Sequence, residues 1–188
     1  MDAFSYLSVL LSIILGLAIT EVLQGFRGLM HARSRTVLYW PVIAWGVLVI
    51  VMAVQAWWTM FGYRHIRDWT FIVFSVVLLQ TIATYLLAAL ALPDARGDAA
   101  VDLRKHYYEH RRWFFAMLLA IVLVSLLKSL VVDGKLPDPV DLTFHGFFAV
   151  LSLSGIVIAA PRYHEALAAL GVLLLGAYIG ILFVHLHP

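Results

Sequence analysis

The sequence predicts an all-α integral membrane protein, folded as one domain that is a bundle of six transmembrane helices. Hydrophobic residues make up 63% of the 188 residues and charged residues only 13%, a balance outside the range of soluble domains. The mean hydropathy is +0.95. Six apolar runs can be traced along the chain, each with roughly the 20 residues that a helix needs to cross a hydrocarbon core of about 30 Å.

The apolar runs cover residues of about 4–26, 37–61, 69–92, 113–132, 140–160 and 163–185. Pro41 falls in the first turn of the second run, where its missing N–H is harmless, and Pro93 and Pro161 fall between runs. A helix predicted from about Asp98 forms a short cytoplasmic extension that runs straight on into the fourth run. The first run has no basic segment before it and no cleavage pattern after it, so we expect it to remain in the mature protein.

Lysine and arginine are distributed unequally between the predicted loops. With the N-terminus outside, the cytoplasmic loops hold nine of these residues and the opposite loops hold four. Because cytoplasmic loops are enriched in Lys and Arg, this imbalance predicts the orientation and places both termini in the periplasm. The nine are Arg27, Arg33, Arg35, Arg96, Arg104, Lys105, Arg111, Arg112 and Arg162, and the four are Arg64, Arg67, Lys128 and Lys135.

Several classes of function are disfavoured by what the sequence lacks. It contains no cysteine, which excludes disulfides, thiolate chemistry and iron–sulfur sites. The net charge of +2 is too small to indicate a nucleic-acid partner. Neither a Gly-rich phosphate loop nor a nucleophile elbow is present. We therefore expect no cofactor, and we assign no catalytic residue.

Glu21 is a carboxylate within the first apolar run. It lies next to a row of small or polar residues at every fourth position, a pattern by which helices approach one another closely in lipid: Ser8, Ser12, Gly16, Thr20, Gln24 and Gly28. The helical rise puts Glu21 about 7 to 8 Å from the middle of the run. An unpaired carboxylate at that depth costs several kcal/mol, so it must be protonated, paired, or facing water or a cation.

Two readings of Glu21 are open. In the first, Glu21 handles protons or cations in a pathway that it lines together with Thr20, Gln24 and Gln80. In the second, Glu21 is a structural acid that is hydrogen-bonded to a neighbouring helix or reaches towards Arg27. Gln80 has its own alternative, because amides within the membrane usually hold helices together.

A second polar pair is predicted near the outer face. Lys128 lies about one turn below the outer end of the fourth run, and His145 lies at a similar depth in the fifth. The two side chains can share one site. Snorkelling of the lysine towards the headgroups is the alternative explanation for Lys128.

The segment DLRKHYYEHRRWFF combines two histidines with a cationic, aromatic surface. His106 and His110 are four residues apart on a predicted helix, a spacing that lets two imidazoles hold one metal. His31, His164 and Glu109 are assigned to the same side of the membrane. We favour the simpler interpretation that the basic residues contact headgroups of an anionic inner leaflet. These residues are Arg104, Lys105, Arg111 and Arg112.

Six segments carry a resemblance to a known family: YLSVLLSIILGLAIT, LYWP, QAWW, DWTF, YLLAALALPD and HYYEHRRWFF. Over roughly its first two thirds, the chain resembles a family of small bacterial multi-pass membrane proteins with no assigned function. This resemblance implies a location in the bacterial inner membrane. It brings no activity and no site residue.

Together, these observations predict a homo-oligomeric ion or proton channel, transporter or sensor that uses Glu21. A single bundle of six short helices leaves little room for a pathway inside itself, and rows of small residues on the first and sixth runs offer interfaces to another copy. The alternatives are a non-catalytic membrane scaffold or partner subunit, and a membrane-bound metalloenzyme that uses His106 and His110.

Overall fold

The computed structural model describes residues 3–66, 68–95 and 100–182. It contains six helices that are long and apolar enough to span a membrane, which confirms the predicted all-α class of fold. Their bounds are α1 Ala3–His31, α2 Trp40–Met60, α3 Phe71–Ala91, α4 Leu103–Asp133, α5 Pro139–Val157 and α6 Pro161–Leu182. Two 3-10 turns, η1 Arg33–Arg35 and η2 Phe61–His65, and two short strands, β1 Thr36–Val37 and β2 Val101–Asp102, lie in the connections.

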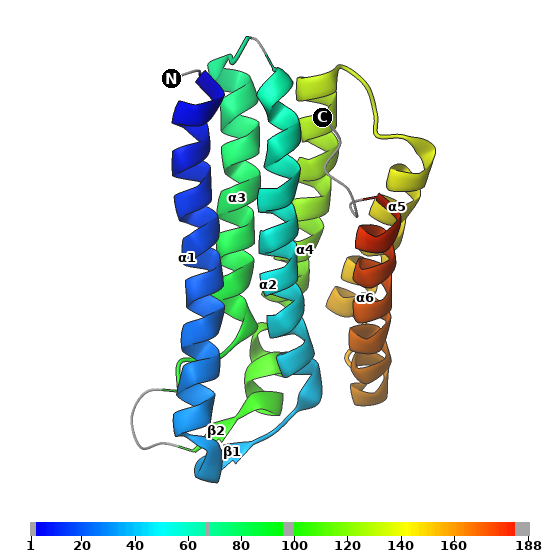
Figure 1. Cartoon of the computed structure of the whole chain (residues 1–188). Coiled ribbons are helices and arrows are strands. Elements are labelled where there is room, and N and C mark those ends of the chain that lie inside the picture. The colour runs from blue at the N-terminus through cyan, green and yellow to red at the C-terminus, as the bar shows by residue number, and fades with distance from the viewer. Residues whose placement is uncertain (1–2, 67, 96–99, 183–188) are drawn as a thin grey trace.

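Five of the six helices form a closed ring. Around this ring α2 packs against α3, α3 against α4, α4 against α5, α5 against α6, and α6 against α2. Helix α1 lies outside the ring and packs against α2 and α3 (Figure 1). We call the end with the α2–α3 and α4–α5 connections the upper end, and the end with β1 and β2 the lower end.

The start of α4 differs from the prediction of a helix from about Asp98. Residues 96–99 lie outside the described part of the chain, and α4 begins at Leu103. Before it, Val101 and Asp102 are extended and pair in parallel with Thr36 and Val37. The Asp102 carboxylate then accepts a hydrogen bond of 3.0 Å from the Lys105 backbone N–H, which caps the helix. From Leu103, α4 runs unbroken to Asp133, as the predicted extension required.

The other helix ends follow from local chemistry and shift the predicted boundaries slightly. α1 continues to His31, beyond the predicted end at residue 26. α4 ends at Gly134, whose φ of 67° is the left-handed conformation that glycine adopts easily. α5 starts after Asp138, which accepts from the backbone N–H groups of Val140 and Asp141. The predicted end of the sixth run, residue 185, lies outside the described residues.

The lower half of the ring is filled by tightly packed aromatic side chains. Trp45 of α2 meets Phe115 of α4 edge to face, with ring centroids 5.4 Å apart. Gly155 of α5 lies so close to Phe115 that a Cβ there would come within 2.6 Å of the ring. A Cβ at Gly171 of α6 would likewise come within 2.8 Å of the Trp45 ring. The lower half of the ring is thus closely packed at these positions.

Candidate functional site

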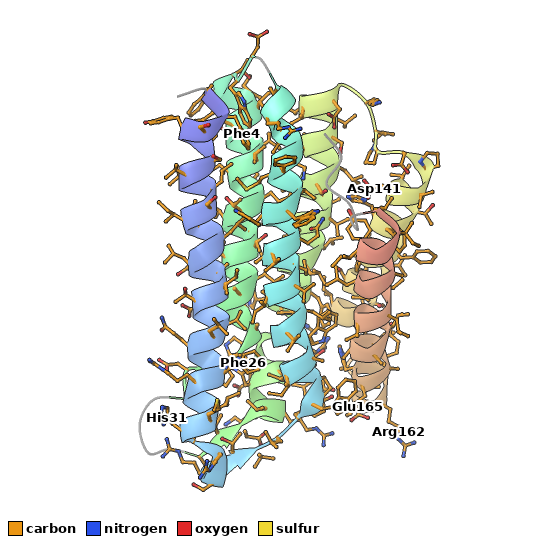
Figure 2. The ribbon with its side chains drawn as sticks, in the orientation of Figure 1. Phe4, Phe26, His31, Asp141, Arg162 and Glu165 are labelled. Carbon is orange, nitrogen blue, oxygen red and sulfur yellow. The ribbon has the colours of Figure 1, made fainter. Side chains whose placement is uncertain are left out.

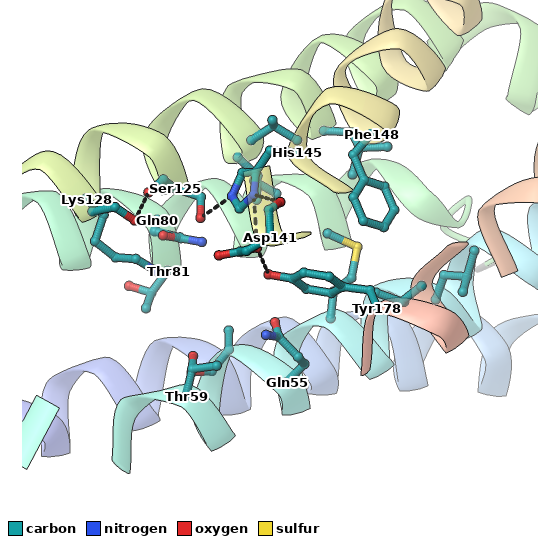
Figure 3. A pocket seen from close by; sticks show the side chains of 18 of the residues that line it. Gln55, Thr59, Gln80, Thr81, Ser125, Lys128, Asp141, His145, Phe148 and Tyr178 are labelled. Carbon is teal, nitrogen blue, oxygen red and sulfur yellow. Dashed lines mark hydrogen bonds and ion pairs between the residues drawn. The ribbon is translucent and has the colours of Figure 1, made fainter. Parts of the chain in front are cut away.

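A cavity of about 250 Å³ occupies the upper half of the ring. All five ring helices line it, together with Tyr63 of η2, whereas α1 contributes no lining residue. Its lower half is apolar, and its upper half carries amides, hydroxyls, a lysine, a carboxylate and a histidine (Figure 3). The last three are Lys128, Asp141 and His145.

Asp141 and His145 form a hydrogen-bonded pair on the cavity wall, and this is an ion pair when the imidazole carries two protons. They are one turn apart on α5, and His145 Nδ1 lies 3.1 Å from Asp141 Oδ1. The Tyr178 hydroxyl of α6 donates to the same oxygen at 3.1 Å, and the Ser125 hydroxyl of α4 lies 3.0 Å from His145 Nε2. Three helices therefore meet in one hydrogen-bonded chain, drawn with dashed lines in Figure 3.

The contacts of His145 determine which ring nitrogen carries the permanent proton. Nδ1 faces two acceptors, the Asp141 carboxylate and the Asp141 backbone carbonyl at 2.8 Å. A nitrogen between two acceptors must be a donor, so Nδ1 is protonated. Nε2 faces the Ser125 hydroxyl, which can either donate or accept. Nε2 is therefore the atom at which a proton can be added or removed.

The wall beside the hydrogen-bonded pair carries Lys128 and Gln80. The Lys128 ammonium lies 5.7 Å from the centre of the Tyr63 ring, and no carboxylate among the described residues lies within 4.0 Å of it. The Oε1 atom of Gln80 is buried and has no hydrogen-bond donor within the described chain. Figure 3 shows Gln55 and Thr59 of α2 on the opposite wall.

The floor of the cavity is buried, whereas part of its upper wall is exposed. Trp45 on the floor is only 4% exposed, whereas the Asp141 side chain is 22% exposed and lies near the upper end of the bundle (Figure 2). The packing of Trp45 against Phe115 and Gly171 closes the lower end. The cavity is therefore closed at its lower end.

The structure brings together the two residues of the predicted outer pair, but it separates Gln80 from the other residues of the predicted pathway. Lys128 and His145 line the same cavity, and Gln80 lines it too. The expectation that Gln80 shares a cavity with Glu21 is wrong, because α1 lies outside the ring. Thr20 is exposed, and its hydroxyl bonds to the backbone carbonyl of Gly16 at 2.8 Å.

Glu21 and Gln24 line a different hollow on the lower half of the molecule, between α1 and the end of α3. This groove of about 400 Å³ also contains the basic side chains of Arg27, His31 and Arg35. Glu21 is half-buried there and Gln24 is exposed. Glu21 therefore faces a surface groove of mixed charge, which Asp94 also lines, and not the interior of the ring.

The expected headgroup contact of Arg111 is also wrong. Arg111 is 6% exposed, and its Nη1 donates to the backbone carbonyls of Gly155, Ile156 and Ile158 at 2.8, 2.8 and 3.1 Å. These carbonyls end α5, where the helix dipole favours a cation. The three remaining basic residues of the predicted surface, Arg104, Lys105 and Arg112, are exposed.

The histidines considered for a metal site make other contacts. The rings of His106 and His110 stack at 4.6 Å, and His110 Nδ1 turns to the His106 carbonyl at 3.0 Å. Both ring nitrogens of His164 are engaged, by the Tyr107 hydroxyl at 2.9 Å and the Ile158 carbonyl at 2.7 Å. Within residues 3–66, 68–95 and 100–182, no three His, Asp or Glu side chains form a group that could hold a metal.

Sequence reasoning missed Asp141 and Tyr178. Asp141 stands four residues before His145, a spacing that puts both on one face of a helix. The pairing of these two residues could therefore have been predicted from the sequence. Tyr178 joins them only because α6 returns beside α5.

Comparisons with protein-family models, with curated proteins and with solved structures give no match to this chain.

Proposed function

We propose that this protein is a proton- or ion-handling membrane transporter or sensor that works through the upper cavity. One observation carries the proposal. His145 has one nitrogen fixed as a donor by Asp141 and the other directed towards the cavity through Ser125. Such a histidine, held in one tautomer with a carboxylate behind it, is an arrangement suited to taking up and releasing a proton.

The remaining polar groups fit this role. When Nε2 takes up a proton, the Asp141 carboxylate compensates the positive charge, and the Tyr178 hydroxyl keeps that carboxylate in place. The Ser125 hydroxyl reverses its direction and becomes the acceptor. Because the floor around Trp45 is closed, passage to the other side needs a rearrangement of the lower half of the ring, as in alternating access and not in an open pore.

We further propose that the chain lies in a bacterial inner membrane with the lower end in the cytoplasm. The lower end carries most of the described Lys and Arg residues, which agrees with the enrichment of these residues on the cytoplasmic side. Arg67 and Arg96 lie outside the described residues. The exposed side chains of Arg104, Lys105 and Arg112 then face the anionic inner leaflet.

A second candidate keeps Glu21 as the ion-handling group of a homo-oligomer. It is favoured by the exposure of Gly16, Thr20 and Gln24 along one face of α1, which leaves this row of small and polar residues open to another copy. In that arrangement the groove that contains Glu21 lies beside the interface between the copies.

Proton flux into proteoliposomes tests both candidates. The purified protein is reconstituted with an internal pH-sensitive dye, and acidification is recorded after an external pH drop. We expect flux in the wild type and at least a tenfold loss in Asp141→Asn and His145→Gln, with Glu21→Gln unaffected. Loss in Glu21→Gln alone would favour the second candidate.

Asp133→Asn is the matched control, because Asp133 is an exposed carboxylate at the end of α4 and does not line the cavity. Wild-type flux in this variant would show that the loss of flux in Asp141→Asn comes from the change in the cavity and not from removal of a carboxylate in general. No flux in the wild type under any gradient would contradict both candidates and would favour the membrane scaffold.

A further inference from the structure

The upper cavity contains a positive charge that the proposed proton site does not use. Lys128 lines the cavity, and among the described residues no carboxylate lies within 4.0 Å of its ammonium. Asp141, the one carboxylate in the lining, is already engaged by His145 and Tyr178. A cation between apolar helices favours an anion beside it.

A second polar group on the same wall also lacks a partner among the described residues. The Gln80 Oε1 atom is buried without a hydrogen-bond donor among the described residues. Leaving a buried acceptor unpaired is energetically unfavourable, so such atoms are normally satisfied by a partner. A ligand that completes this wall offers an anionic oxygen to Lys128 and a donor, such as a hydroxyl, to Gln80.

Below these groups the cavity is apolar. Its lower half is lined by Trp45, Leu48 and Leu118, together with further aliphatic side chains from α4 and α6. A ligand seated here would bury a hydrocarbon or aromatic body downwards and keep its polar end upwards. The volume of about 250 Å³ suits a small molecule. At the roughly 30 Å³ that one water occupies in the liquid, it corresponds to the volume of about eight waters.

We infer that the cavity binds a small organic acid with an apolar body, a carboxylate that contacts Lys128 and a hydroxyl that donates to Gln80. This inference rests on the proposed role of the cavity and names the class of molecule bound there. Protonation of His145, in the same lining, adds a second positive charge to the cavity and favours the anion further.

Calorimetric titration of the purified protein with two matched acids tests the inference. The probes are 2-hydroxy-2-phenylacetate and phenylacetate, which differ by the one hydroxyl. We expect the hydroxy acid to bind about five- to tenfold more tightly, the value of one hydrogen bond to a buried acceptor. Gln80→Leu should remove this difference by weakening only the hydroxy acid relative to its partner.

Lysine variants test the anionic contact. Lys128→Gln should weaken both acids by about ten- to a hundredfold, as expected for loss of a charged hydrogen bond, and Lys128→Arg should retain most of the binding. Lys135→Gln is the control, because Lys135 is exposed in the α4–α5 connection and does not line the cavity. Unchanged binding in Lys128→Gln, or no binding of either acid to the wild type, would overturn the inference.

The two proposals fail in different ways. Binding of the acids with the expected pattern, but without proton flux in proteoliposomes, would refute the proton-handling function and leave the ligand class standing. Proton flux that depends on His145, without binding of either acid, would refute the ligand class alone.

Discussion

Arg111 and His164 donate to the same atom, the backbone carbonyl oxygen of Ile158, at 3.1 and 2.7 Å. Arg111 comes from α4 and His164 from α6, and Ile158 follows the last turn of α5. Arg111 also binds the carbonyls of Gly155 and Ile156. Three helices are thus joined at the lower end, directly below the aromatic floor of the cavity.

Arg111→Gln should destabilise the protein by about 1.5 to 3 kcal/mol, because it removes charged hydrogen bonds and leaves the carbonyls at the end of α5 without their buried donor. Thermal unfolding in detergent, compared with wild type, measures the effect. Arg112→Gln is the control, since Arg112 is the next residue and is exposed. Equal shifts in the two variants would show that the buried contacts carry no stability.

Gly155→Ala should cost about 1 to 3 kcal/mol, the usual effect of overpacking. The new methyl group would lie within 2.6 Å of the Phe115 ring, so the ring or α5 must move. Gly146→Ala is the matched control on the same helix, because nothing lies within 4 Å of its Cβ position. That change should be neutral or stabilise by up to about 1 kcal/mol. Wild-type stability of Gly155→Ala in the same thermal assay would contradict the packing described here.

The sequence was sufficient to predict the six helices. It was not sufficient to predict which side of each helix contacts which neighbour. Apolar runs of membrane length predicted all six helices, because the length and hydropathy of a segment are local properties. Which side of each helix meets which neighbour is not local. Glu21 and Gln80 were grouped because both are polar and deep in their runs, yet α1 lies outside the ring and Gln80 faces into it.

In the site, too, some contacts could be predicted from the sequence and others depend on how the helices pack. Lys128 and His145 could be paired from their similar depths in successive runs, whereas Tyr178 reaches Asp141 through the packing of α6 on α5. Arg111 sits in a run of basic residues that is typical of a solvated surface. Its burial depends on the end of α5 lying against α4, which no pattern within its own segment can indicate.

Gly16→Leu should disrupt a homo-oligomer if the exposed row on α1 is the interface between copies. Nothing in the chain lies within 4 Å of the Gly16 Cβ position, so the larger side chain should leave the monomer fold intact. Light scattering coupled to size exclusion in detergent gives the mass of the protein in each complex. Gly176→Leu, on α6 and equally open, tests the alternative interface. A monomeric wild type would contradict both interfaces.

The most direct test of the central claim is the protonation state of His145 in a bilayer, measured by solid-state NMR on protein with ¹⁵N-labelled histidine. The signal is assigned by its loss in His145→Gln. We predict a ring that carries hydrogen at Nδ1 at high pH and gains a second proton at Nε2 as the pH falls, with Asp141→Asn altering that transition. A His145 ring that carries its hydrogen at Nε2 when neutral, or that keeps one form across the whole pH range, would contradict the account.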